Sequence, residues 1–286
     1  MTLTASVNSH TQLYGIIGHP VGHSLSPQLH NALFGKLGLN AVYLAFDVDG
    51  PRLGFALEAV RTLGIKGLNV TVPHKETVLE FIDEIPEDLD RCVGAVNTIV
   101  NRDGRLFGYN TDVPGFLMAL REELGFDPRG KKILVLGAGG AARAAVFALA
   151  WAGADAVTIH NRTPARAKGL EGYLATHFGD TDVRAVDAGE AAAGKVDLVV
   201  NATSLGLKAF DPPPFDLGSL KGKPAAYDIV YGRATKFLET AARLGLPHAG
   251  GGGMLAAQAA ASFALWTGRK DGVRETLMET LKACTP

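Results

Sequence analysis

The chain has 286 residues, of which 47% are hydrophobic and 20% charged, and its formal net charge at pH 7 is −1. This length allows two domains with a full hydrophobic core, and the composition is ordinary for a globular enzyme. Because the charge is almost balanced, the sequence offers no basic surface for a nucleic acid or an anionic membrane, and we expect neither as a partner.

The first part of the chain alternates between short apolar runs and amphipathic segments. Strands are expected at residues 13–17, 42–46 and 67–70, and helices at 27–38, 52–63, 75–82, 86–92 and 116–124. Ser26 is interpreted as the N-cap of the first helix, because Pro27 suits the first helical position. Residues 101–104, Asn-Arg-Asp-Gly, predict a turn between hairpin strands at 95–100 and 105–109. This alternation predicts an α/β fold with a largely parallel sheet.

A glycine-rich turn dominates the middle of the chain. The sequence predicts a strand at 133–136, a turn at 137–142, a helix to about Trp151 and a second strand at 156–159. This is the order of a β-α-β unit, in which the helix N-terminus can hold a pyrophosphate with backbone N–H groups. Gly137 permits the turn, Gly139 lets the backbone approach the phosphates, and Ala142 lets helix and strand pack closely.

The end of the second strand of this unit indicates which dinucleotide binds. NAD enzymes usually place Asp or Glu there for the ribose 2′-hydroxyl, whereas this chain has Asn161, Arg162 and Thr163, with Arg166 one turn later. Two guanidiniums and a hydroxyl suit a phosphate, so we expect NADP(H) as the cofactor. The alternative is that Arg162 and Arg166 are only solvated residues at the start of a helix.

The remainder of the chain continues the same alternation. Helices are expected at 166–177 and 236–244, strands at 196–200 and 225–230, and two further helices from Met254 onward, joined around 268–271. Residues 249–268 carry no charge, but their glycines and the polar Gln258 and Ser262 favour a buried helix over a membrane span.

The N-terminus and the cysteines bear on the compartment. Residues 1–12 have neither a basic patch nor an apolar core, so we expect no signal peptide. Cys92 and Cys284 match neither a metal-ligand spacing nor a disulfide framework. We interpret both as reduced packing residues in a cytoplasmic protein.

Polar residues at the predicted strand ends supply the groups that a nicotinamide-dependent enzyme needs. Reduction of a carbonyl by hydride requires a proton, which Lys75 or Asp112 could deliver, and the two charges would shift each other's pKa if they lay close together. Hydrogen bonds to a polyhydroxylated, carboxylated substrate could come from Ser24, Ser26, Thr71 and Asn97. Spacing alone does not distinguish these roles from those of ordinary solvated residues.

Short motifs along almost the whole chain carry a resemblance to one family. They are residues 22–27 (GHSLSP), 69–75 (NVTVPHK), 94–98 (GAVNT), 109–112 (YNTD), 137–141 (GAGGA), 161–163 (NRT), 201–204 (NATS) and 254–258 (MLAAQ). In this order they closely resemble shikimate dehydrogenase. The resemblance implies reversible, NADPH-dependent reduction of 3-dehydroshikimate to shikimate, in the pathway to chorismate and the aromatic amino acids.

The resemblance also implies roles for individual residues. It assigns Lys75 and Asp112 as the catalytic pair, with the lysine as acid/base, and Ser24 and Ser26 to the substrate carboxylate. Around the ring hydroxyls and the carboxylate it further places Thr71, Asn97, Asp112, Gln258 and Tyr231. On the cofactor side it implies Gly137, Ala138, Gly139, Gly140 and Ala141 for the pyrophosphate, Asn161, Arg162, Thr163 and Arg166 for the 2′-phosphate, and Thr203, Ile229 and Gly251 elsewhere along the dinucleotide.

The family architecture implies two domains with a cleft between them. Residues 1–112 are expected to bind substrate, 113–247 to form the NADP-binding Rossmann domain, and 248–286 to return to the substrate domain, which would bring Gln258 to the substrate. The segment after Tyr231 departs from the family pattern because it is shorter and lacks a proline, so the sequence leaves its conformation and the position of Arg233 open.

Two other functions remain open on sequence alone. A quinate/shikimate dehydrogenase would accept a related ring and often uses NAD, and no residue here firmly excludes quinate. A Rossmann protein that senses NADP(H) without turnover would have no need of a Lys–Asp pair. The sequence does not distinguish a monomer from a homodimer.

Overall fold

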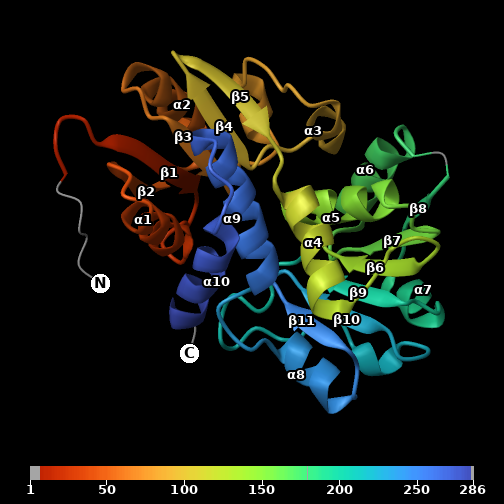
Figure 1. Cartoon of the computed structure of the whole chain (residues 1–286). Coiled ribbons are helices and arrows are strands. Elements are labelled where there is room, and N and C mark those ends of the chain that lie inside the picture. Colours follow the sequence, from red (N-terminus) through yellow and green to blue (C-terminus); the bar gives the residue numbers. More distant parts are fainter. Residues whose placement is uncertain (1–6, 179, 285–286) are drawn as a thin grey trace. The chain divides into compact units, whose positions relative to one another are not determined.

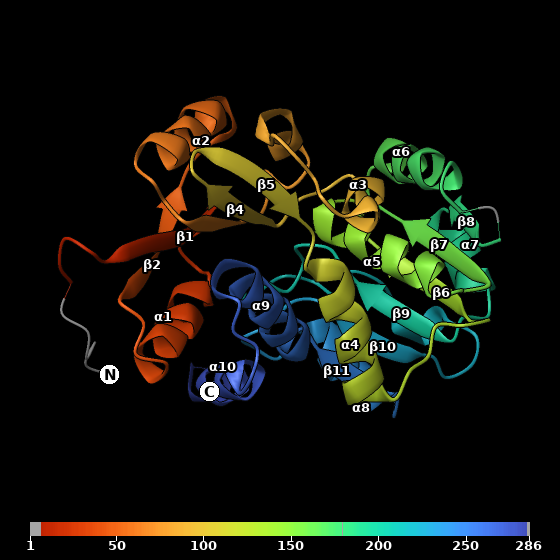
Figure 2. The same cartoon turned by 45° about the horizontal axis from the view of Figure 1, so that its top comes forward.

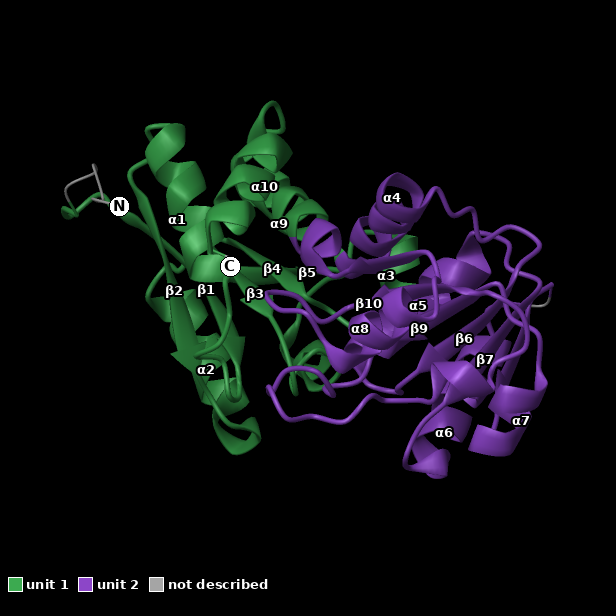
Figure 3. Cartoon of the chain, turned by 90° about the horizontal axis from the view of Figure 1, so that it is seen from below, with its two compact units in different colours: residues 1–111, 256–286 green, residues 112–255 purple. Residues whose placement is uncertain are grey.

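The computed structural model describes residues 7–178 and 180–284 of the chain. The chain divides into two compact units (Figure 3). The first comprises described residues within 1–111 and 256–286, and the second comprises 112–255. Figure 1 gives the element labels used below.

The first unit contains a five-stranded sheet in the order β2-β1-β3-β4-β5. Its strands are β1 (Gln12–Gly18), β2 (Ala41–Asp47), β3 (Gly67–Val70), β4 (Thr98–Arg102) and β5 (Arg105–Tyr109). The first three are parallel, whereas β4 runs antiparallel to both β3 and β5. Asn69 lies opposite Thr98, and Thr98 lies opposite Tyr109. The carboxyl ends of β1, β2, β3 and β5 and the amino end of β4 therefore share one edge of the sheet.

Helices from both ends of the chain belong to this unit. They are α1 (Ser26–Lys36), α2 (Leu53–Thr62), α3 (Asp88–Val93) and α10 (Val273–Cys284), with short 3-10 helices at Gly50–Arg52 and Thr77–Phe81. Helix α9 (Gly252–Thr267) begins in the second unit and continues into the first. It packs closely on the sheet, because a Cβ on Gly67 would lie 2.2 Å from Nε1 of Trp266, which donates to the carbonyl of Ile99 at 2.9 Å.

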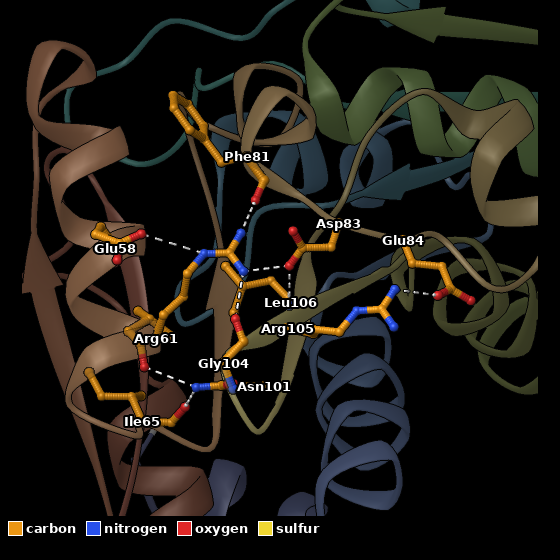
Figure 4. Close-up of polar contacts among 11 residues, drawn as sticks. Glu58, Arg61, Ile65, Phe81, Asp83, Glu84, Asn101, Gly104, Arg105 and Leu106 are labelled. Carbon is orange, nitrogen blue, oxygen red and sulfur yellow. Dashed lines mark hydrogen bonds and ion pairs between the residues drawn. The ribbon is translucent and has the colours of Figure 1, made fainter.

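A polar cluster fastens the β4–β5 hairpin to α2 (Figure 4). The guanidinium of Arg61 donates to the carboxylate of Asp83, to the carbonyl of Gly104 at 2.6 Å and to that of Phe81 at 2.9 Å. Nδ2 of Asn101 donates to the carbonyl of Ile65 at 2.9 Å. These bonds fix the hairpin from which β5 leads to residues 110–112.

The second unit is built on a six-stranded parallel sheet in the order β11-β10-β9-β6-β7-β8. Its strands are β6 (Lys132–Leu136), β7 (Ala156–His160), β8 (Asp182–Ala185), β9 (Leu198–Asn201), β10 (Ala225–Asp228) and β11 (His248–Gly250). Its helices are α4 (Asp112–Leu124), α5 (Gly140–Trp151), α6 (Pro164–Ala175), α7 (Ala188–Ala193) and α8 (Lys236–Arg243), with a 3-10 helix at Leu217–Ser219. Helices α4 and α5 lie side by side in Figures 1 and 2 and pack together. Helices α7 and α8 share a core with the sheet, in which Ala191, Phe237 and Ala241 are buried.

The predicted α/β fold with a Rossmann-type sheet is confirmed. Among the described strands, the only antiparallel pairs are β3 with β4 and β4 with β5, the expected hairpin. Three details differ from the expectations. Helix α4 begins at Asp112 rather than 116, because Pro114 falls in the first turn, where an N–H would have no intrahelical acceptor. The helix expected at 75–82 is only a short 3-10 helix. The short elements β8, α7 and β11 were not predicted, since their sequences (DVRA, AGEAAA and HAG) contain no run of large apolar side chains.

Both cysteines are free, Cys92 is partly buried, and Cys284 is exposed on the last turn of α10. The interpretation of Cys284 as a packing residue is therefore wrong. Within the described ranges, no helix combines the length and the apolar character that crossing a bilayer would require.

Candidate active site

The loop after β1 presents two serines near the shared sheet edge. The N–H of Ser24 donates to the carbonyl of Val21 at 3.0 Å, which closes a tight turn. The N–H of Ser26 donates to Oγ of Ser24 at 3.2 Å. Ser26 is the first residue of α1 and is buried, and the residue before it makes no side-chain cap. The prediction that Ser26 is the N-cap is therefore wrong, because the helix includes it.

The loop after β3 is held at three points and carries Lys75. The N–H of Thr71 donates to the carbonyl of Ile17, and that of His74 donates to the carbonyl of Thr71, both at 2.9 Å. Nε2 of the buried His74 lies 2.6 Å from the carbonyl of Val48. The carbonyl of Lys75 accepts from the N–H of Val96 at 2.8 Å. His74 is thus an anchor for Lys75, which sequence reasoning treated only as part of a motif.

Asn97, Thr111 and Gln258 meet at the same edge. Oδ1 of Asn97 accepts from the N–H of Thr111 at 2.7 Å, and Nδ2 donates to Oγ1 of Thr111 at 2.9 Å. Nδ2 also lies 3.3 Å from Oε1 of Gln258. Residues that are 161 positions apart in sequence are therefore neighbours, as the resemblance implied for Gln258.

Sequence reasoning missed a second set of polar residues behind this cluster. Nδ2 of the buried Asn69 donates to Oγ of Ser262 at 3.0 Å, and Oδ1 accepts from the hydroxyl of Tyr43 at 2.7 Å. Oγ1 of Thr98 lies 2.8 Å from Oγ of Ser262. The available signal was the spacing of Gln258 and Ser262, because residues four apart lie on one face of a helix.

The catalytic pair expected from the sequence divides between the units. Lys75 lies in the first unit and is half-buried, whereas the buried Asp112 is the first residue of α4 and of the second unit. Asp112 directly follows Thr111, whose backbone is fixed by Asn97. The pairing of Lys75 with Asp112 stays a prediction, as does the contact of Tyr231 with substrate.

The glycine turn between β6 and α5 has the expected backbone. Gly137 has φ of +117°, and a Cβ on it would lie 2.7 Å from the carbonyl oxygen of Ala202. Gly139 is the N-cap of α5 and has no side chain to cap the helix. The N–H groups of the first turn can therefore donate to another acceptor, such as a ligand oxygen. A Cβ on Gly139 would meet nothing within 4 Å. This turn can accept a phosphate at a helix N-terminus.

The segment after β7 presents two exposed arginines. Nδ2 of Asn161 donates to the carbonyl of Thr163 at 2.9 Å, and the N–H of Arg166 donates to the same carbonyl at 3.1 Å. Arg162 and Arg166 are exposed, and neither forms an ion pair with another residue in the described part of the chain. Two solvated guanidiniums at the end of β7 fit both a 2′-phosphate site and the alternative of ordinary residues at a helix start, so the 2′-phosphate site stays a prediction.

Asp228 connects the remaining loops at the carboxyl ends of β9 and β10. It is fully buried, and Oδ1 accepts from Nδ2 of Asn201 at 2.9 Å and from the N–H of Val230 at 3.0 Å. Burial raises the pKa of Asp228 to about 6, against the lowering effect of these hydrogen bonds and that of Thr235. Oδ1 of Asn201 accepts from the hydroxyl of Thr203 at 2.8 Å. The network therefore fixes Thr203 in the loop after β9 and Val230 in the loop after β10.

Two further predicted cofactor positions, Ile229 and Gly251, lie against each other. A Cβ on Gly251 would lie 2.1 Å from the carbonyl oxygen of Ile229, so only glycine fits there. In the shortened loop, Gly232 has φ of +81°, and Nη1 of Arg233 donates to the carbonyl of Leu207 at 3.1 Å. The conformation that the sequence left open is thus set by a bond to the neighbouring loop.

The fold and these loops define a Rossmann-type dinucleotide-binding protein with a second α/β unit. Residues 16–99 match the shikimate dehydrogenase substrate binding domain, 120–209 match shikimate/quinate 5-dehydrogenase, and 251–278 match the shikimate 5′-dehydrogenase C-terminal domain. The chain belongs to the shikimate dehydrogenase family.

Individual relatives agree with this assignment over nearly their whole length. The chain is 46% identical to a shikimate dehydrogenase (NADP(+)) of Methanopyrus kandleri, covering 99% of this chain and 100% of the relative. It is 48% identical to the protein of that name in Moorella thermoacetica, covering 92% and 90%. The crystal structure of shikimate 5-dehydrogenase from Thermus thermophilus with NADP(H) and shikimate is similar, with a TM-score of 0.84 and 39% identity, covering 96% of this chain and all of that one.

Proposed function

We propose that the chain catalyses the reversible reduction of 3-dehydroshikimate to shikimate with NADPH, within the route to chorismate and the aromatic amino acids. The observation that carries this proposal is the hydrogen-bonded cluster of Asn97, Thr111 and Gln258 at one sheet edge of the first unit. Such a cluster of amides and hydroxyls suits a substrate with several ring hydroxyls. Family membership and the NADP(+) in the relatives' names support the same reaction.

In this proposal the substrate and NADP(H) bind mainly to different segments of the chain. Residues 1–112 bind the substrate, 113–247 bind NADP(H), and 248–286 contribute Gln258 to the substrate. Ser24 and Ser26 bind the carboxylate together with Tyr231, and Thr71, Asn97, Gln258 and Asp112 bind the ring hydroxyls. The serine hydroxyls are supported in this role by the turn that fixes both residues beside β1.

The cofactor is held by backbone and by charge. The turn formed by Gly137, Ala138, Gly139, Gly140 and Ala141 receives the pyrophosphate at the N-terminus of α5. Asn161, Arg162, Thr163 and Arg166 bind the 2′-phosphate, and Thr203, Ile229 and Gly251 line the rest of the dinucleotide. NADPH supplies the hydride, and the protein supplies orientation and a proton.

In this proposal Lys75 transfers the proton that the reaction needs, and Asp112 assists by binding the substrate. As the hydride forms the new C–H bond, the carbonyl π electrons move to oxygen, which takes a proton from the ammonium of Lys75. In the reverse direction neutral Lys75 removes the hydroxyl proton as the hydride leaves. Asp112 binds and orients the substrate hydroxyl beside the reacting carbon.

Kinetic assays of the purified chain with shikimate and quinate, each with NADP⁺ and NAD⁺, test this proposal. We expect the highest kcat/KM with shikimate and NADP⁺. Comparable turnover of quinate would favour the broader quinate/shikimate dehydrogenase. Binding of NADP⁺ without turnover of either substrate would favour the non-catalytic module and contradict the proposal.

We further propose a cytoplasmic enzyme, as a monomer or a homodimer. The two free cysteines support a reducing compartment, where thiols persist. Sedimentation equilibrium of the purified chain distinguishes the two assembly states.

A further inference from the structure

Ser262 lies at the centre of a buried network that joins α9 to the sheet edge of the first unit. Its side chain is fully buried, and its hydroxyl donates to the carbonyl of Gln258, one helical turn earlier, at 3.0 Å. The same oxygen lies 3.0 Å from Nδ2 of Asn69, 2.8 Å from Oγ1 of Thr98 and 3.2 Å from Oγ1 of Thr111. One hydroxyl therefore connects α9 to β3, to β4 and to the segment after β5.

Backbone groups determine the orientation of the side-chain amides in this network. The N–H of Thr111 can only donate, so the atom of Asn97 that receives it at 2.7 Å is Oδ1, and the other end of that amide is Nδ2. Because Nδ2 can only donate, Gln258 receives it through Oε1, at 3.3 Å. The Gln258 amide is therefore turned with its oxygen toward Asn97 and its NH₂ group away from it.

We propose that Ser262 is a positioning residue for substrate binding. By holding α9 against the sheet edge, it keeps Gln258 in the orientation that presents Nε2 as a hydrogen-bond donor to a ring oxygen of the substrate. The inference rests on the proposed function and deepens the role of Gln258 in it, since it assigns both the direction of that hydrogen bond and the residue that maintains it.

The geometry explains why the Ser262 hydroxyl matters for Gln258. The bond between Asn97 and Gln258 is long and Gln258 is partly exposed, so a small shift of α9 would break it. Ser262 is the anchor one turn from Gln258, whereas Trp266, which bonds the carbonyl of Ile99, is two turns away. In a Ser262→Ala variant the Trp266 anchor keeps α9 on the sheet, but the register of Gln258 is no longer fixed.

The test is the steady-state kinetics of Ser262→Ala, with Thr267→Ala as the matched control. The hydroxyl of Thr267 bonds the carbonyl of Phe263 at 2.8 Å in the same i to i−4 manner, outside the network. We expect Ser262→Ala to raise KM for shikimate about tenfold, as for the loss of a well-placed hydrogen bond, and to leave KM for NADP⁺ within about twofold. Thr267→Ala should change neither.

A double-mutant cycle with Gln258→Ala separates positioning from a general loss of stability. If Ser262 acts through Gln258, adding Ser262→Ala to Gln258→Ala should change KM for shikimate by less than about twofold. Equal effects of Ser262→Ala with and without Gln258, or kinetics like those of Thr267→Ala, would overturn the inference while leaving the proposed function intact. Absence of shikimate turnover by the unaltered chain would overturn the proposed function and this inference with it.

Discussion

The hydroxyl of Thr235 donates to Oδ2 of Asp228 at 2.5 Å, and these two buried residues lie at the two ends of the loop that carries Tyr231. Thr235 is also the N-cap of α8, where its oxygen accepts from the N–H of Leu238. One residue thus completes a helix terminus and satisfies a buried carboxyl group, so the order of this loop depends on a group that titrates.

Replacement of Asp228 by Asn should change the pH dependence of stability. The pKa of Asp228 is raised from 3.8 to about 6 by burial, so the folded state holds more protons than the unfolded state between these values. The free energy of unfolding of the unaltered chain, relative to Asp228→Asn, should therefore fall as pH rises from about 4 to about 6 and stay constant above. Urea titrations from pH 4 to pH 8 measure this difference, and a flat difference would contradict the assignment.

His30 should give the opposite dependence. It is fully buried and stacked on Tyr43, with ring centroids 4.5 Å apart, and its ring nitrogens have no hydrogen-bond partner among the described residues. Burial lowers its pKa from 6.5 to about 3, so only the unfolded state binds a proton between these values. Relative to His30→Leu, the unaltered chain should lose up to about 1.4 kcal/mol of stability per pH unit as pH falls below 6.5.

The same denaturation series separates the pH dependence that is due to His30 from that of the buried carboxyl groups. Asp90 and Asp228, both with pKa raised to about 6 by burial, gain protons on folding in part of this range and stabilise the folded state as pH falls. Because these groups remain in His30→Leu, the difference between the two proteins isolates His30. A difference that does not grow with acidity would show that His30 is charged or exposed in the folded state.

The two glycines of the dinucleotide turn should respond differently to alanine. Gly137→Ala places a methyl group 2.7 Å from a carbonyl oxygen at a positive φ, and should cost about 1–3 kcal/mol of stability. Gly139→Ala meets nothing within 4 Å and has an extended backbone, so its stability should be unchanged. If the pyrophosphate lies against this turn, as proposed, the added methyl group should raise KM for NADP⁺ about tenfold by the loss of charge-assisted hydrogen bonds.

Thermal denaturation and cofactor titration distinguish these two effects. If Gly139→Ala bound NADP⁺ as well as the unaltered chain while remaining folded, the pyrophosphate would not lie against this turn. Gly169→Ala, in the exposed middle of α6, is the matched control, because its Cβ also meets nothing within 4 Å and it lies outside the turn.

Replacement of Arg162 by Ala should affect only the phosphorylated cofactor. The exposed guanidinium has no ion pair within the described ranges that would be lost, so stability should not change. Loss of a charged hydrogen bond to the 2′-phosphate should raise KM for NADP⁺ about 10- to 100-fold, and KM for NAD⁺ should stay the same. Lys168→Ala, on the exposed side of the helix that follows, is the control. A parallel rise for both cofactors would place Arg162 elsewhere than at the 2′-phosphate.

If Lys75 donates the proton to the reacting oxygen, as proposed, replacement of Lys75 by Ala should reduce kcat by a factor of about 10² to 10⁴. KM for NADP⁺ should change little, since Lys75 belongs to the unit proposed to bind substrate. Lys66→Ala, which removes an exposed lysine just before β3, should retain full activity. Unaltered turnover in Lys75→Ala would leave the lysine without a role in proton transfer.

Features that depend only on neighbouring residues follow from the amino-acid sequence alone. The turn at 101–104, the glycine turn before α5 and most of the strands and helices are set by backbone conformations and by local periodicity, and the structure has them. Motif order was sufficient to indicate the family to which the chain belongs.

Which polar groups meet depends on how distant segments of the chain pack together. Ser262 lies 193 residues from Asn69 and 151 from Thr111, so no local pattern relates them. The position of Arg233, which the sequence left open, is likewise fixed by the carbonyl of Leu207, 26 residues away. The physical reason is that buried polar groups must find partners wherever the packed chain places them, whereas periodicity records only which face of an element is buried.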